Sequence, residues 1–148
     1  MTRVAFERAF QELKDDEVAT LMARARLLEY PAGAVIIRNG DPQDRILIIL
    51  EGEVRVIRLS GKGVEKELAD PLGPGDTAGE MSFVDRMGAS ATLVSRSDVV
   101  LKAIDRETID EMAGKDPGFM TRFYHSLLIT VIRRLRVLDY KMTFATPP

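Results

Sequence analysis

The spacing of apolar residues divides the chain into helical ends and a strand-rich middle. Near the N-terminus, apolar residues recur at helical spacing over positions 4–13 and again over 18–25. Asp15 and Asp16 offer an N-cap for the second helix, and Glu17 adds a carboxylate to its first turn, where negative charge is favourable. The pattern therefore predicts two short helices before the strands begin.

The middle of the chain predicts short strands separated by glycine-containing turns. Residues 46–50 form a wholly apolar run of β-formers, which indicates a strand buried on both faces. In the next run, Val54, Val56 and Ile57 are expected to point inward. Arg55 and Arg58 are expected to point outward. The strands are predicted at 35–37, 46–50, 53–59, 64–69, 91–95 and 99–104. This pattern is typical of an antiparallel sandwich or barrel, and periodicity alone does not choose between them.

The longest predicted helix lies near the end of the chain. After a short helix over 106–112, Asp116 supplies a cap and Pro117 takes the first position of a helix that runs to about Lys141. Its apolar residues repeat as a heptad seam, formed by Tyr124, Leu128, Val131, Leu135, Leu138 and Met142. The seam predicts a homodimer interface; packing of the whole helix on its own barrel is the alternative.

The same helix carries a basic cluster, Arg133, Arg134 and Arg136. We expect these cations to favour the negative end of the helix dipole and to pair with Asp139 or other acidic neighbours. A role in binding nucleic acid is less favoured, because the net charge of the chain is −2.

Composition excludes several kinds of chemistry. The chain has no cysteine, which excludes disulfides, thiolate zinc sites and a thiol nucleophile. Its one histidine, His125, cannot by itself build a metal site or a catalytic triad, so we expect neither a metal nor enzymatic activity. There is no apolar stretch of roughly 18–20 residues and no signal peptide, so we expect a cytoplasmic protein that makes no membrane contact.

Residues 71–93 carry the most specific pattern in the sequence. A tight glycine–proline turn is followed by Gly79 and Glu80, which open a short predicted helix. The free N–H groups of such a turn suit an anion, above all a phosphate. The Glu80 carboxylate would repel phosphate but can accept hydrogen bonds from sugar hydroxyls. Together these groups suit a nucleotide better than free phosphate.

The run GDTAGEMSFVDRMGASAT resembles the phosphate-binding cassette of the cyclic nucleotide-binding domain family, the Crp/Fnr-type effector domains. Gly79 and Glu80 match the opening of that cassette, and Ser90, Ala91 and Thr92 match its closing run. The resemblance extends over roughly residues 12–140. It implies a mainly β fold, a double-stranded β-helix (jelly-roll, cupin-like β-roll) flanked by N-terminal helices and a long C-terminal helix.

The resemblance also implies a role for each matching residue. Glu80 would bind the ribose hydroxyl, and the backbone N–H groups of Met81 and Ser82 would bind phosphate. The remaining implied contacts come from Ser90 and Thr92 in the cassette and from Ser126 or Thr130 against the base.

Ala89 departs from the family, which has an arginine there that grips the phosphate with two hydrogen bonds. Losing such a contact is expected to weaken binding about 100-fold. Arg86, three residues earlier, could swing in to replace it; otherwise it is a solvated loop charge.

By resemblance we expect a regulatory sensor domain that binds cyclic AMP or cyclic GMP, weakly or with altered specificity, and signals through its last helix to an unknown effector protein. The alternative is a degenerate, ligand-independent dimerisation or docking module. No DNA-reading helix-turn-helix is expected. The predicted parts are a helical segment (1–26), the β-roll (27–104), C-terminal helices (105–142) and a frayed tail (143–148).

Overall fold

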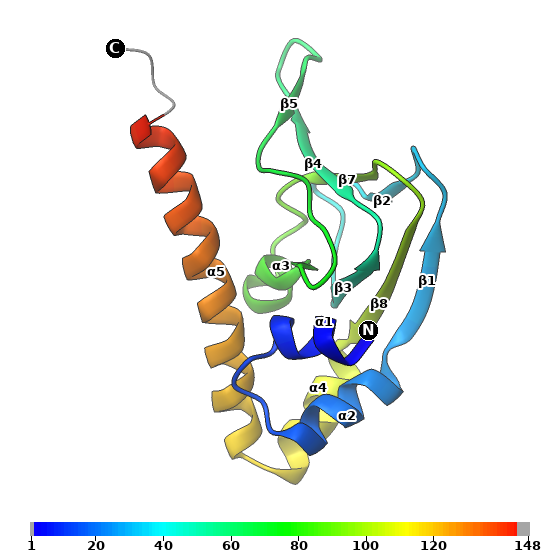
Figure 1. The fold of residues 1–148 in the computed structure, drawn as a ribbon, viewed down its shortest axis with the longest axis vertical. Coiled ribbons are helices and arrows are strands. Elements are labelled where there is room, and N and C mark those ends of the chain that lie inside the picture. Colours follow the sequence, from blue (N-terminus) through cyan, green and yellow to red (C-terminus); the bar gives the residue numbers. More distant parts are fainter. Residues whose placement is uncertain (1, 145–148) are drawn as a thin grey trace.

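Two four-stranded antiparallel sheets form the middle of the protein in a computed structural model, which describes residues 2–144 (Figure 1). The first sheet has the strand order β1-β8-β3-β6 and the second β2-β7-β4-β5. The strands are β1 (Arg26–Tyr30), β2 (Val35–Ile37), β3 (Arg45–Glu51), β4 (Val54–Leu59), β5 (Glu65–Glu67), β6 (Thr77–Ala78), β7 (Thr92–Ser95) and β8 (Val99–Asp105). This is the predicted β-roll.

Strand β3 separates two apolar cores. Four of the five residues in its predicted apolar run, 46–49, are buried, and Leu50 is partly buried. Because side chains alternate along a strand, Ile46 and Ile48 join a cluster with the helices, whereas Leu47 and Ile49 join the cluster inside the roll.

Helices cover one end of the roll and extend beside it (Figure 1). They are α1 (Thr2–Ala9), α2 (Asp15–Arg24), α3 (Glu80–Asp85), α4 (Arg106–Lys115) and α5 (Gly118–Phe144). Phe123 of α5 is at the centre of their shared core, with ring centroids 5.7–5.9 Å from those of Phe10, Phe83 and Phe119. Aromatic burial therefore ties the first part of α5 (residues 118–127), which we call its base, to α3 and to the residue that follows α1.

Local corrections to the predicted elements have clear causes. The cap of α2 is Lys14 rather than an aspartate, and its N–H donates to the Glu17 side chain over 2.9 Å. Strands β1 and β6 were not predicted, because β1 mixes charged and apolar residues and β6 has only two residues. Asp116 does cap α5, since its carboxylate accepts the N–H of Gly118 over 2.9 Å. The predicted tail begins inside α5, and residues 145–148 lie outside the described region.

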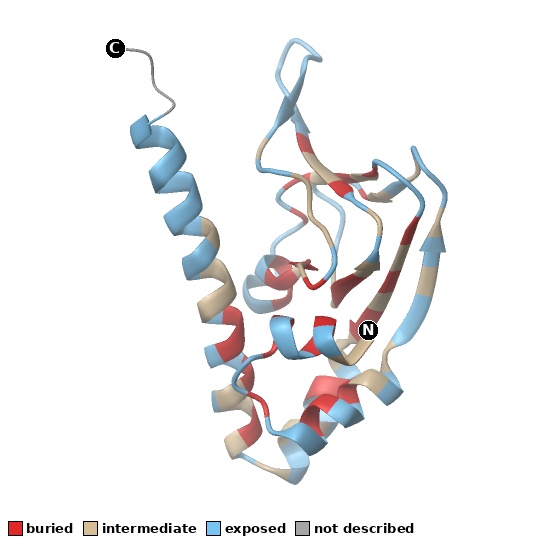
Figure 2. Cartoon of the chain, in the orientation of Figure 1, coloured by how far each residue is buried: buried red, intermediate tan, exposed pale blue. Residues whose placement is uncertain are grey.

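The two halves of α5 differ in burial (Figure 2). All of its buried residues lie at or before Leu127. Beyond that point most of the predicted seam is exposed, as at Leu128 (56%) and Leu135 (53%). The homodimer remains a prediction. Despite its length, α5 is too polar to span a membrane, and no other helix within residues 2–144 is suited to do so.

Candidate ligand-binding site

A glycine determines the backbone geometry at the start of the cassette, which runs over residues 79–92. Gly79 has φ +84°, and a Cβ there would lie 2.6 Å from the carbonyl oxygen of Arg45 on β3. Only glycine fits this close approach and this left-handed backbone. Helix α3 starts at the next residue, so its first N–H groups lack partners within the helix and present positive partial charge.

The closing run lies against the turn before β3. The N–H of Ala89 donates to the carbonyl of Asp41 over 2.9 Å, and the N–H of Gly40 donates to the carbonyl of Ala89 over 2.8 Å. Ala89 is buried in the core of the roll. The Ser90 hydroxyl lies 3.9 Å from the Met81 sulfur, so the opening and closing segments of the cassette meet.

Glu80 is buried, with 4% of its surface exposed, and it is paired with a residue of the last helix. The guanidinium of Arg134 donates to Glu80 Oε1 and to the carbonyl of Thr77, and lies 3.3 Å from the Thr77 hydroxyl. Glu80 Oε2 is also buried, and within residues 2–144 it has no hydrogen-bond partner. The carboxylate thus presents one occupied oxygen and one free oxygen.

This pairing corrects the prediction for the basic cluster. We expected Arg134 to favour the helix dipole and to pair with Asp139 or another acidic neighbour. It does pair with a carboxylate, but this is Glu80, 54 residues away along the chain, and not Asp139. Arg134 and Thr77 are therefore site residues that sequence reasoning missed. A weak signal existed, because a buried glutamate needs a cation and this helix carries three arginines in four positions.

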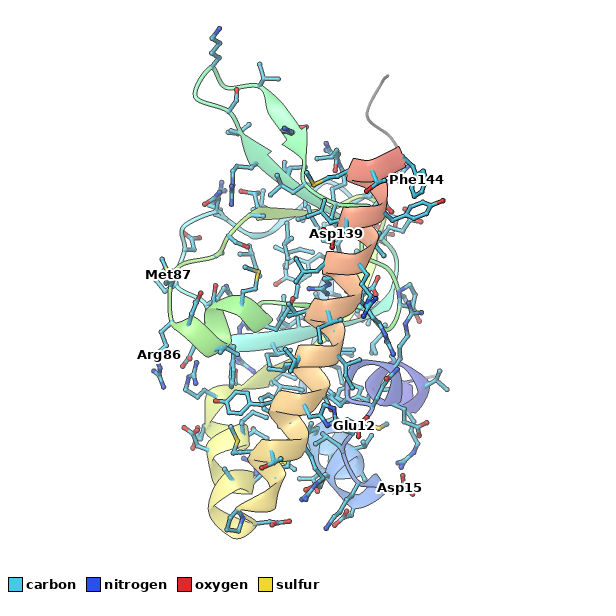
Figure 3. The ribbon with its side chains drawn as sticks, turned by 90° about the vertical axis from the view of Figure 1, so that its left-hand side faces the viewer. Glu12, Asp15, Arg86, Met87, Asp139 and Phe144 are labelled. Atoms are coloured by element: carbon cyan, nitrogen blue, oxygen red, sulfur yellow. The ribbon has the colours of Figure 1, made fainter. Side chains whose placement is uncertain are left out.

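Several predicted contacts lie elsewhere. Arg86 ends α3 at φ 60°, is exposed, and lies with Met87 at the edge away from α5 (Figure 3). This exposure fits the alternative of a solvated loop charge, and replacement of the arginine missing at position 89 by Arg86 stays a prediction. The Thr92 hydroxyl accepts the N–H of Asn39 over 2.9 Å. The Ser126 hydroxyl accepts the N–H of Glu12 over 3.1 Å and so holds the N-terminal segment.

The remaining predicted residues are distributed between core and surface. Ser82 and Ala91 are buried, whereas Met81 and Ser90 are exposed. The Thr130 hydroxyl donates to the carbonyl of Ser126 over 3.3 Å, a bond within α5.

An ion-pair network fixes the base of α5. Arg122 donates to the Glu17 carboxylate over 2.6 and 2.9 Å and to Asp116 over 2.8 Å. The Arg122 hydrogen bond is the main cause that lowers the pKa of Glu17, with a further contribution from the N–H of Lys14 and opposition from burial. The pKa of Arg122 is correspondingly raised, mainly by Glu17. These groups therefore remain charged near neutral pH.

No group of three or more potential metal ligands occurs within residues 2–144.

The sequence profile of the family described as "Cyclic nucleotide-binding domain" matches residues 27–116, more than half of the chain. The chain belongs to this family. The match includes the cassette and all eight strands except the first residue of β1, so the family assignment and the fold agree.

Known cyclic nucleotide-binding domain proteins resemble the chain over nearly all of its length. A cyclic AMP receptor protein of Thermus thermophilus is 32% identical over 133 residues, covering 90% of this chain and 59% of that protein. The crystal structure of the Thermus thermophilus catabolite activator protein matches with a TM-score of 0.76 at 30% identity, covering 93% of this chain and 62% of that chain.

A third match supports the fold alone. A cyclic nucleotide-binding domain from Methylobacillus flagellatus matches with a TM-score of 0.83 at 24% identity, covering 99% of this chain and 86% of that chain. The chain spans about three fifths of the length of the Thermus thermophilus receptor protein and of the chain in the Thermus thermophilus crystal structure.

Proposed function

We propose that this chain is a regulatory domain that binds a cyclic nucleotide at the cassette and transmits binding through α5. The observation that carries the proposal is the state of Glu80, a buried carboxylate with one oxygen held by Arg134 and the other free. The relatives named for cyclic AMP support the nucleotide as the ligand class.

The free oxygen of Glu80 accounts for the sugar contact. A buried acceptor without a donor costs about 1–3 kcal/mol. A ribose hydroxyl would donate to Oε2 and remove that cost, while Oε1 keeps its bond to Arg134. The N–H groups of Met81 and Ser82 then face the phosphate at the start of α3.

Arg134 accounts for the charge balance. A phosphate next to Glu80 would be repelled unless a cation lay between or beside them. Arg134 already lies on Glu80, so its guanidinium offsets that negative charge. Because Arg134 belongs to α5, ligand contact with Glu80 acts directly on the position of the last helix.

A second candidate is a ligand-independent dimerisation module. Ala89 at the position of the phosphate-binding arginine and the exposed seam of α5 favour it. The intact Gly79 and Glu80 geometry favours the binding domain instead.

Calorimetric titration with cyclic AMP and cyclic GMP separates the two candidates. We expect heat of binding for the wild type, and a loss of about 10- to 100-fold in affinity for Glu80→Gln, since a charge-assisted acceptor becomes neutral. The exposed Glu107→Gln is the matched control and should bind as the wild type does. Absence of heat at millimolar ligand would contradict cyclic nucleotide binding. Gain of binding only in Ala89→Arg would identify a degenerate site.

A further inference from the structure

The β4–β5 hairpin carries opposite charge arrangements on its two faces. On one face Arg55 contacts Glu65 over 2.7 Å and Glu67 over 2.8 Å, so its charge is neutralised. On the other face Arg58 lies directly opposite Lys66 in the strand register. Each face thus carries one arginine of β4, but Arg55 lies beside two carboxylates and Arg58 lies opposite a second cation.

The face of Arg58 is the one that continues the interior of the roll. Side chains alternate along a strand, so Arg58 shares its face with Val54 and Val56. Both valines belong to or pack against the inner core, opposite Ser95 and Leu93 of β7. Arg58 therefore lies on the face of these valines and not on that of Arg55, and its side chain is exposed, as predicted.

Arg58 also reaches the closing run of the cassette. Its guanidinium donates to the carbonyl oxygen of Ser90, the residue that follows Ala89. This bond uses part of a group that has five N–H donors. The guanidinium of Arg58 thus lies next to the position where the family has its phosphate-binding arginine, with N–H donors left for another acceptor.

The positive charges of this face are uncompensated in the structure. Within residues 2–144, neither Arg58 nor Lys66 makes an ion pair, whereas Arg55 on the opposite face makes two. Like charges directly opposite each other across a strand pair repel and destabilise the pair. Arg134 is not available in the same way, because Glu80 already neutralises it. An anion beside the cassette would relieve the repulsion between Arg58 and Lys66.

We propose that Arg58 replaces the arginine absent at position 89 and donates to the anionic phosphate of the ligand, with Lys66 adding to the positive field. This inference rests on the proposed function, since it names the cation of the same site. It explains how the cassette can hold a phosphate although Ala89 carries no charge.

Calorimetry with cyclic AMP tests the proposal against a matched pair of variants. Arg58→Ala should bind about 10- to 100-fold more weakly, whereas Arg55→Ala, on the opposite face of the same strand, should bind as the wild type does. Adenosine, which has no phosphate, should bind Arg58→Ala and the wild type equally. Adding Ala89→Arg to Arg58→Ala should restore the affinity for cyclic AMP.

The outcomes separate this inference from the proposed function. Unchanged cyclic AMP affinity in Arg58→Ala, with loss in Glu80→Gln, would overturn the role of Arg58 and leave the function standing. If the wild type does not bind cyclic AMP, an NMR titration of the ¹⁵N-labelled protein with inorganic phosphate tests the role of Arg58 separately. Changes in the amide chemical shifts of residues 80–82 and 90 that are lost in Arg58→Ala would support an anion site at Arg58 that needs no nucleotide. Absence of such changes in the wild type would overturn the inference.

Discussion

The two halves of α5 are held to the protein in different ways. Its first half buries Phe119, Phe123 and Leu127 in the helical core and is braced by Arg122. Residues 131–144, which we call the tip of α5, contain no buried residue (Figure 2). The tip makes polar contacts with the roll, from Arg134 to Glu80 and Thr77 and from Lys141 to Asp70.

On the proposed function, this difference predicts that the helix responds to a ligand in its tip and not in its first half. Burial of large apolar side chains fixes the base whatever the state of the site. The pair of Lys141 and Asp70 is exposed, and such pairs contribute about 0–1 kcal/mol. Arg134 therefore ties the tip to a buried group of the roll, and this partner, Glu80, is the carboxylate predicted to bind the sugar.

The largest expected effect comes from removing a buried aromatic side chain at the base of α5. Phe123→Ala removes a fully buried ring that contacts three other phenylalanines and should lower the free energy of unfolding by about 3–5 kcal/mol. Val137→Ala in the exposed tip is the control and should change it by less than about 0.5 kcal/mol. Chemical denaturation measures both. Equal effects at the two positions would contradict the division of α5 into a fixed base and an exposed tip.

The next effect concerns association through the exposed seam. Leu128→Glu combined with Leu135→Glu places two charges on the predicted dimer interface and should give monomers in sedimentation experiments. Arg136→Ala, an exposed change off the seam, should leave the mass unchanged. A wild type that is already monomeric, or a double variant of undiminished mass, would refute the seam as an interface.

Low pH should destabilise the attachment of the base of α5 through its ion pair with Glu17. Because Arg122 lowers the pKa of Glu17 in the folded state, this carboxylate stabilises the fold above its unfolded pKa of about 4.5. That contribution is lost as the pH falls through the lower folded value. Melting temperatures measured from neutral pH down to about pH 3 should therefore fall less steeply for Glu17→Gln than for the wild type. Parallel curves would show that Glu17 has the same pKa in both states.

The smallest effect distinguishes the two polar contacts of the tip. Lys141→Ala should change the free energy of unfolding by less than about 1 kcal/mol and leave amide hydrogen exchange over 131–144 nearly unaltered. Arg134→Ala should accelerate that exchange, since it removes the contact with buried Glu80. The reverse ranking would mean that Lys141, not Arg134, holds the tip.

Sequence reasoning succeeded where the cause is local. The unbroken apolar run of β3 predicted burial on both faces, and Asp116 with Pro117 predicted the start of α5. The cassette was recognisable because Gly79 and Glu80 are adjacent in sequence and their geometry depends on the backbone between them.

It failed where the cause is distant or where one rule outweighed another. Nothing local links Arg134 to Glu80, because packing of α5 against the roll brings them together across 54 residues. Arg58 was predicted to point outward because it is charged, and its side chain is exposed. Residue polarity did not indicate that Arg58 lies on the same face of β4 as Val54 and Val56, which follows from the alternation along the strand.

Amide hydrogen exchange over the tip of α5, with and without cyclic AMP, tests the central claim most directly. Ligand that completes the bonding of Glu80 should also stabilise its pair with Arg134, so exchange over residues 131–144 should slow in the wild type and not in Arg134→Ala. Exchange over the base, around Phe123, should not change. Saturating ligand that leaves exchange of the tip unaltered would contradict coupling between the cassette and the last helix.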